Sequence, residues 1–148
     1  GEAAARMGRC AVPPTFRVDQ GVLPTVLQSS DFAQMAGQLR TLLRDLTGNQ
    51  GLRPEQIVVL SPYRRDNAAS AWAVGLDACA TTDALAAPLP GRVRVGTVQG
   101  FKGLESDVVV LVGIDLRCMR HPANLYVGAS RARAALYVLA LADAGLAA

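Results

Sequence analysis

Apolar residues follow one another without alternation in three short segments of this chain, at residues 57–60, 108–112 and 136–140. Such runs are typical of strands that are covered on both faces of a sheet. β-Branched residues also dominate residues 92–98, and a shorter apolar stretch, interrupted by Pro24, lies near the start. The predicted strands cover residues 22–27, 57–60, 92–98, 107–114 and 136–140.

Between the first two strands, apolar side chains recur three and four positions apart, which predicts an amphipathic helix. These positions are Phe32, Met35, Leu39, Leu42, Leu43 and Leu46. Ser29 or Ser30 is expected to cap the helix, because a serine hydroxyl accepts a hydrogen bond from the free N–H groups of the first turn. Gly48-Asn49 is expected to end it. Two further helices are predicted at residues 67–76 and 122–134. Residues 77–91 are predicted to form a loop.

Strands and helices thus alternate along the chain. This order, with continuously apolar strands, predicts an α/β fold in which a parallel sheet carries helices on both faces. The 148 residues fit one domain. We place this domain at residues 22–148, because residues 1–21 lack periodicity and contain Pro13-Pro14, which is typical of a linker or peripheral segment.

Composition narrows the class of protein. The chain is 51% hydrophobic, yet it has no apolar run of the roughly 20 residues that a membrane span requires. The first residues are too polar for a signal peptide, so a cytoplasmic location and no membrane partner are expected. Three widely spaced cysteines and one histidine do not match any metal-ligand spacing, and we expect no metal ligands in this chain. A net charge of +3 is only weak support for an anionic partner.

The densest cluster of candidate chemistry lies between the strands at 92–98 and 107–114. This loop carries Gly100, Gly103, the carboxylate of Glu105 and the only lysine of the chain, Lys102. Glycines let backbone N–H groups approach an anion without a Cβ in the way. Because buried strands flank the loop, we expect it at an edge of the sheet, where α/β folds place ligand sites. The alternative is a tight turn without a ligand.

This loop, taken with residues 124–133, resembles motifs V and VI of superfamily 1 helicases of the UvrD-like group, with patterns close to T-x-H-x-x-K-G-L-E and L-Y-V-A-x-T-R-A-R. Gln99 stands where the family has histidine, and Ser130 where it has threonine. The resemblance covers roughly residues 22–141 and implies a RecA-like, P-loop NTPase-type sheet. The matching residues are Thr97, Lys102, Gly103, Leu104, Glu105, Leu125, Tyr126, Val127, Arg131, Ala132 and Arg133.

The resemblance also implies roles for these residues. Gly103 and Glu105 would face a nucleotide, Glu105 accepting hydrogen bonds from the ribose. Lys102 would assist at the nucleotide or the DNA, or else pair with a neighbouring acid. Arg131 would be an arginine finger for the γ-phosphate. On a helix, Arg133 would point roughly 200° away from Arg131, so we expect Arg133 to be a solvated or interface charge. Thr97 and Gln99 would lie nearer a DNA track.

Residues 63–67, which follow the strand at 57–60 directly, resemble the family stretch that ends in Y-R-x-N and touches a single strand. Tracking a single strand requires cations along the phosphates and an aromatic face for base stacking. Tyr63, Arg64 and Asn67 supply these groups. A solvated polar cap at the start of a helix is the alternative.

The pattern G-x-x-x-x-G-K-[ST] does not occur in these 148 residues, and neither does a strand that ends in Asp-Glu. ATP and Mg²⁺ would therefore be held mainly by an N-terminal RecA-like lobe of the same parent protein. The resemblance implies the C-terminal motor lobe of an ATP-dependent DNA helicase with 3′-to-5′ polarity, inactive in isolation. The alternatives are a non-catalytic module that binds nucleic acid or protein, and an RNA-directed motor, which Gln99 would favour.

Overall fold

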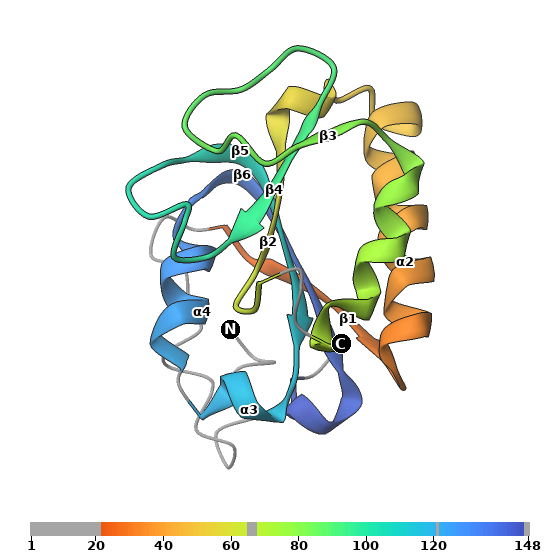
Figure 1. Ribbon diagram of the computed structural model, residues 1–148, viewed down its shortest axis with the longest axis vertical. Coiled ribbons are helices and arrows are strands. Elements are labelled where there is room, and N and C mark those ends of the chain that lie inside the picture. Colours follow the sequence, from red (N-terminus) through yellow and green to blue (C-terminus); the bar gives the residue numbers. More distant parts are fainter. Residues whose placement is uncertain (1–21, 65–67, 121, 147–148) are drawn as a thin grey trace.

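Six parallel strands form one sheet in the computed structural model, in the order β1-β6-β5-β2-β4-β3 (Figure 1). The structure describes residues 22–64, 68–120 and 122–146. The predicted α/β class, a parallel sheet with helices on both faces, is confirmed. The strands are β1 Pro24–Ser29, β2 Ile57–Ser61, β3 Thr81–Thr82, β4 Val93–Thr97, β5 Ser106–Ile114 and β6 Ala132–Leu141.

The centre of the sheet is formed by the continuously apolar segments. Every residue of β2 is buried, and so is β5 apart from Asp107. Val59 pairs with Val110, which in turn pairs with Tyr137 of β6. Burial on both faces explains why these strands do not alternate between apolar and polar residues.

Helices cover the two faces of the sheet as separate layers (Figure 1). On one face, α2 and the 3-10 segment η5 pack on a core that includes Met35, Leu39 and Trp72. On the other, α3 and α4 enclose a core that includes Phe101 and Leu125. The helical segments are α2 Phe32–Arg44, the π-helical η3 Asp45–Asn49, η4 Pro54–Gln56, η5 Ala68–Ala78, α3 Leu116–Met119, α4 Pro122–Ala129 and η6 Ala142–Ala144.

The predicted serine cap of the first helix is wrong. Asp31 caps α2, its carboxylate accepting a hydrogen bond from the N–H of Gln34 at 2.8 Å. Ser30 instead donates its hydroxyl and its N–H to the Gln34 side chain. The spacing of the apolar positions does place the helix correctly, and helical structure ends at Asn49 as expected.

The predicted helix at 122–134 is too long. α4 ends at Ala129, and β6 begins at Ala132, which pairs with Ser106 at the start of β5. The parallel ladder with β5 outweighs the helix propensity of the alanines here. Arg131 therefore lies in a turn and Arg133 in strand β6, so the two arginines do not share one helix as predicted.

Smaller differences concern the ends of the sheet. β3 occupies two residues within the predicted loop at 77–91, and η5 is a 3-10 segment with non-helical backbone at Ser70. Pro24 starts β1 rather than interrupting it, which is a position that tolerates proline because β1 is an edge strand.

The predicted linker at residues 1–21 lies outside the described residues. Within the described residues, no helix is both long and apolar enough to cross a membrane.

Candidate functional site

The loop between β4 and β5 runs from the end of the sheet where the strands finish to the end where they begin. These two ends are called the carboxyl edge and the amino edge. β4 ends at Thr97 and β5 begins at Ser106, the two strands run parallel, and β2 lies between them. Residues 98–105 must therefore run from the carboxyl edge of the sheet to the amino edge. The expectation that this loop lies at one edge of the sheet is corrected: Thr97 and Glu105, eight positions apart, lie at opposite edges.

Tight turns and one buried aromatic ring hold this crossing in place. The Thr97 hydroxyl accepts a hydrogen bond from the N–H of Gly100 at 2.9 Å, and the Thr97 carbonyl accepts one from Phe101 at 3.1 Å. Phe101 is fully buried in the core beneath α4. Gly103 has a φ of +83°, a left-handed conformation that favours glycine. The loop is thus pinned at its centre.

At the amino edge, Glu105 and Arg131 lie on adjacent segments of chain. The N–H of Ser106 donates to the carbonyl of Arg131 at 3.1 Å, and the N–H of Arg131 donates to the carbonyl of Gly128 at 3.2 Å. Arg131 is half-buried, and its Nε is buried without a hydrogen-bond partner in the part of the chain that the structure describes. The fold therefore brings these two predicted residues together through the backbone of the first β5–β6 pair.

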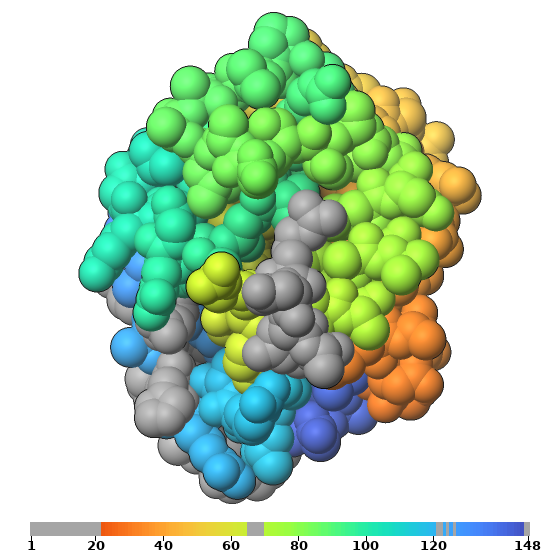
Figure 2. Space-filling view, viewed as in Figure 1, coloured from red at the N-terminus to blue at the C-terminus, as the bar shows by residue number. Residues whose placement is uncertain are grey.

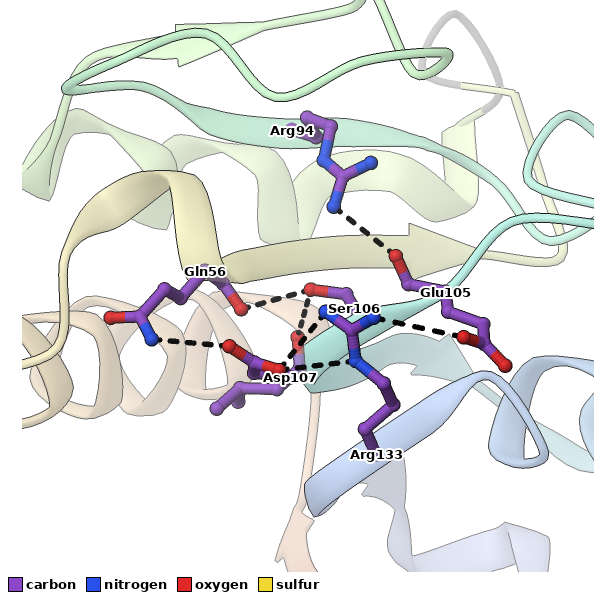
Figure 3. Close-up of polar contacts among 7 residues, drawn as sticks. Gln56, Arg94, Glu105, Ser106, Asp107 and Arg133 are labelled. Atoms are coloured by element: carbon purple, nitrogen blue, oxygen red, sulfur yellow. Dashed lines mark hydrogen bonds and ion pairs between the residues drawn. The ribbon is translucent and has the colours of Figure 1, made fainter.

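Arg133 forms surface ion pairs beside them (Figure 3). Its guanidinium lies 3.0 Å from the Asp107 carboxylate and 3.7 Å from that of Glu105. The β5–β6 register shifts between Ser106 and Val108, so an extra β6 residue is accommodated in this region. Arg133 and Glu105 are each more than half exposed, and exposed pairs of this kind contribute little to stability. Glu105 can therefore leave Arg133 at small cost.

Lys102 and Gly103, which were predicted to contact a nucleotide, lie within the loop that crosses from one edge to the other. Lys102 is exposed, and its N–H donates to the Gln99 carbonyl at 3.2 Å. A Cβ built on Gly103 would meet no atom within 4 Å, so open space surrounds this glycine. Its backbone conformation is explained by the turn alone, and the open space leaves room for a ligand.

Arg94, the second residue of β4, is a charged residue that was not predicted from the sequence. It is 3% exposed. Its Nη1 donates to the Leu85 carbonyl at 3.0 Å, its Nη2 to the Glu105 carbonyl at 3.4 Å, and its guanidinium lies 5.1 Å from the centre of the Phe101 ring. Burial, and then the charge of Arg133, lower the pKa of Arg94. An arginine inside a strand that was predicted to be buried was the available signal.

At the carboxyl edge, Tyr63 follows β2, and Thr97 is the last residue of the neighbouring strand β4. The N–H of Val98 donates to the Ser61 carbonyl at 3.0 Å and so joins the ends of β4 and β2. The Tyr63 hydroxyl donates to Asp115 at 2.7 Å, and the Arg117 guanidinium lies 4.8 Å from the centre of the Tyr63 ring. Burial, and then the bond to Asp115, raise the pKa of Tyr63. Part of the predicted stacking surface is thus covered by Arg117.

The remaining predicted residues of this edge are exposed or undescribed. Arg64 and Gln99 are exposed, and the Arg64 carbonyl accepts a hydrogen bond from the Ser70 hydroxyl at 2.6 Å. Asn67 lies outside the described residues. Figure 2 shows the surface of the segment that ends β2 (yellow) next to that of α3 (cyan), which carries Arg117. Tyr63, Asp115 and Arg117 therefore form one cluster, of which only Tyr63 was predicted.

The surface of the domain has two hollows, one of which lies beside residues of the motifs. A cavity of about 360 Å³ lies at the amino edge against Arg94, Glu105 and Arg133. A larger hollow of about 1070 Å³ lies against α2 and β1 and contains none of the motif residues. Among the described residues, no three or more His, Cys, Asp or Glu side chains gather as metal ligands.

Comparison with known proteins agrees with the motifs. Residues 92–139 match the profile of the family described as the UvrD-like helicase C-terminal domain. This segment runs from the start of β4 through most of β6, and so includes the crossing loop, Glu105 and Arg131. The predicted resemblance to this family is confirmed.

Among solved structures, the chain is similar to the C-terminal domain of a possible DNA helicase from Lactobacillus plantarum WCFS1. The two share 18% sequence identity with a TM-score of 0.66, over 94% of this chain and 84% of that one. At this identity the likeness establishes the fold. No curated protein sequence matches the chain.

Proposed function

We propose that this chain is the C-terminal motor lobe of an ATP-dependent DNA helicase with 3′-to-5′ polarity. The observation that carries the proposal is the placement of the two motifs. Glu105 and Arg131 lie side by side at the amino edge, joined by the hydrogen bond from Ser106 to Arg131. Thr97 and Gln99, from the same loop, lie at or beyond the end of β4. One edge then serves the nucleotide and the other the nucleic acid.

Arg131 is the proposed catalytic residue. Transfer of the γ-phosphoryl group develops negative charge on its oxygens, and a guanidinium placed against them stabilises that charge. The Arg131 side chain is half-buried and its Nε is unpaired, so no ion pair within the described residues has to be broken before it contacts a phosphate. Its position in the turn before β6 fixes its backbone, because both its N–H and its carbonyl are hydrogen-bonded.

Glu105, Gly103 and Lys102 are proposed to complete the nucleotide surface. The Glu105 carboxylate, more than half exposed, would accept hydrogen bonds from the ribose hydroxyls after leaving Arg133. Gly103, with open space around it, would admit the ligand close to the backbone. Lys102, exposed on the same loop, would assist. These residues fit the sugar and phosphate parts of ATP.

ATP and Mg²⁺ are proposed to be held mainly by an N-terminal RecA-like lobe of the parent protein, since these 148 residues contain no P-loop sequence. When bound, ATP supplies the energy of each step, and closure of the cleft between two lobes would couple its hydrolysis to movement. The isolated chain is then expected to be inactive. ATPase activity stimulated by DNA from residues 1–148 alone would contradict this.

Single-stranded DNA is proposed to lie along the carboxyl edge. Thr97, Gln99, Tyr63, Arg64 and Asn67 are the proposed contacts. Exposed arginines supply the cations that phosphate tracking needs, and Tyr63 supplies an aromatic face. Comparing stimulation of the parent ATPase by single-stranded DNA and by RNA would test the choice of DNA.

The finger assignment is tested by Arg131→Ala in the parent protein. We expect ATP turnover to fall by a factor on the order of 10³ or more, while ATP affinity, measured with a fluorescent analogue, changes little. Arg44→Ala is a matched control, because Arg44 is an exposed arginine on α2, on the opposite face from α4. Near-normal turnover in Arg131→Ala would reject the assignment.

A further inference from the structure

The cavity at the amino edge is lined by charged side chains, and not all of its arginines are paired with a carboxylate. About 360 Å³ in volume, it lies between η4, β4 and the start of β5 (Figure 3). Three arginines and three carboxylates line it, namely Arg53, Arg94, Arg133, Glu55, Glu105 and Asp107. The formal charges are equal in number, so what matters is which of them are paired with each other.

All three carboxylates are engaged by groups other than Arg94. Asp107 accepts hydrogen bonds from Arg133 and from Gln56, and Glu105 shares Arg133. Glu55 pairs with Arg53 at 3.2 Å and accepts the N–H of Gly91 at 3.0 Å. The N–H of Gly91 lowers the pKa of Glu55, so this carboxylate is ionised at neutral pH.

Of the three arginines that line the cavity, Arg94 is the one for which no carboxylate partner is found among the described residues. It is 3% exposed, its Nη atoms donate to backbone carbonyls, and its Nε is buried without any partner. A buried cation is costly unless it is paired, because neutral carbonyls replace its hydration shell only in part. The Phe101 ring, 5.1 Å away, compensates for some of this loss.

A second arginine faces Arg94 across the cavity. Figure 3 shows Arg94 reaching down from β4 and the Arg133 guanidinium reaching up from β6 toward the same space. The charge of Arg133 contributes to the lowered pKa of Arg94, after the larger effect of burial. Two guanidinium groups that repel each other across a cavity are the arrangement that an oxyanion between them would relieve.

We propose that this cavity is an oxyanion site that takes a phosphate group, with Arg94 as its buried cation and Arg133 as its outer one. Arg94 would donate from its guanidinium to one oxygen, and Arg133 would turn from Glu105 to another. The site adjoins the proposed nucleotide surface, because Glu105 belongs to both, but the proposed finger, Arg131, does not line the cavity. Free phosphate or the phosphate of a nucleotide would satisfy the same groups.

The test is a thermal melt of the 148-residue chain in increasing inorganic phosphate, with chloride adjusted to keep the ionic strength constant. A ligand that binds only the folded state raises the melting temperature as its concentration passes the Kd. We expect a saturable rise in the wild-type chain. Arg94→Met, which keeps an apolar side chain of similar length, should weaken phosphate binding about tenfold or more.

Arg92→Met is the matched control, because Arg92 is an exposed arginine just before the same strand and does not line the cavity. It should retain the rise. If Arg94→Met folds poorly, Arg133→Met, at an exposed position, provides the second variant, and ³¹P line broadening at 10 °C the second readout. An equal response in wild type and Arg94→Met would overturn the proposal, as would a wild-type chain that does not respond.

Separate titrations with ATP and with adenosine distinguish the sources of the phosphate. Stabilisation by inorganic phosphate alone, or by ATP more than by phosphate, supports the site. Stabilisation by adenosine without any response to phosphate would overturn it, because the ligand would then be recognised by its base. None of these results depends on ATP turnover, so the phosphate site and the arginine finger can fail independently.

Discussion

The two edges of the sheet differ in how they hold charge. At the carboxyl edge, Arg64 and Arg117 are exposed, and the neighbouring acid, Asp115, is buried, bonded to Tyr63 and paired with Arg117 at 3.6 Å. At the amino edge, three carboxylates and three arginines line a cavity. An edge with exposed cations suits a continuous polyanion, and an edge with both donors and acceptors suits a small ligand that carries hydroxyls and phosphates.

The crossing at residues 98–105 joins these edges, and Phe101 anchors it. Because the ring is fully buried, the two ends of the loop cannot shift independently of the core. This anchor offers a physical route by which binding at one edge could influence the other. The predictions that follow test the anchor, the carboxyl edge and the turn of the loop.

Phe101→Ala should have the largest effect on stability. Removing a fully buried phenyl ring costs about 3–5 kcal/mol of unfolding free energy, and it also removes the partner of Arg94. Urea unfolding measures the change. Leu89→Ala is the control, since Leu89 is 41% exposed and should cost much less. A loss below about 1 kcal/mol for Phe101→Ala would show that the ring does not anchor the loop.

Alkaline pH should destabilise the carboxyl edge through Cys118. Burial raises the pKa of its thiol to about 11 from an ordinary value of 9.0. The folded state therefore favours the thiol, and its contribution is complete below pH 9 and lost as the pH rises from 9 to 11. This loss amounts to roughly 2 kcal/mol.

Cys118→Ala should remove that part of the pH dependence between pH 9 and 11, measured by urea unfolding at each pH. Tyr63, whose pKa is raised in part by the charge of Cys118, remains in both chains, so the difference between them reports the thiol together with its effect on Tyr63. Cys79→Ala is the comparison variant: Cys79 is less buried, and although burial raises the pKa of its thiol as well, the change in the pH profile should be smaller. Identical pH profiles for wild type and Cys118→Ala would contradict the prediction.

Gly103→Ala should have a smaller effect, confined to the loop. At a φ of +83° an alanine adds about 1–2 kcal/mol of backbone strain, but its Cβ would meet no atom within 4 Å. Gly37→Ala, a helical glycine with equally open surroundings and an ordinary φ, should instead be neutral or stabilising. Chemical denaturation of both variants checks this, and a neutral Gly103→Ala would mean that the loop relaxes easily.

Much of the fold could be predicted from local pattern. β2 and β5 are buried on both faces, and consecutive apolar residues such as Val108–Val112 indicated this burial in the sequence. The spacing of Met35, Leu39 and Leu43 likewise placed α2. Where β6 begins could not be predicted, because its start depends on the ladder with Ser106, a partner 26 residues away.

The site was predictable only in part, for a similar reason. The motif pattern identified Glu105 and Arg131 but placed the whole loop at one edge, since the crossing over β2 depends on strand order. Arg94 was missed because its burial and the cavity beside it arise from tertiary packing. Asp115 and Arg117 were missed because they follow an apolar strand in a segment that carries neither motif.

The separation of the two edges is tested most directly by steady-state ATP turnover in the parent protein over a titration of single-stranded DNA, comparing Arg131→Ala with Arg64→Ala. We predict that Arg131→Ala lowers turnover at saturating DNA and leaves DNA affinity unchanged. Arg64→Ala should weaken DNA affinity and flatten its salt dependence by a slope of about 0.7, with saturated turnover retained. Loss of saturated turnover and of DNA affinity together in both variants would contradict the account.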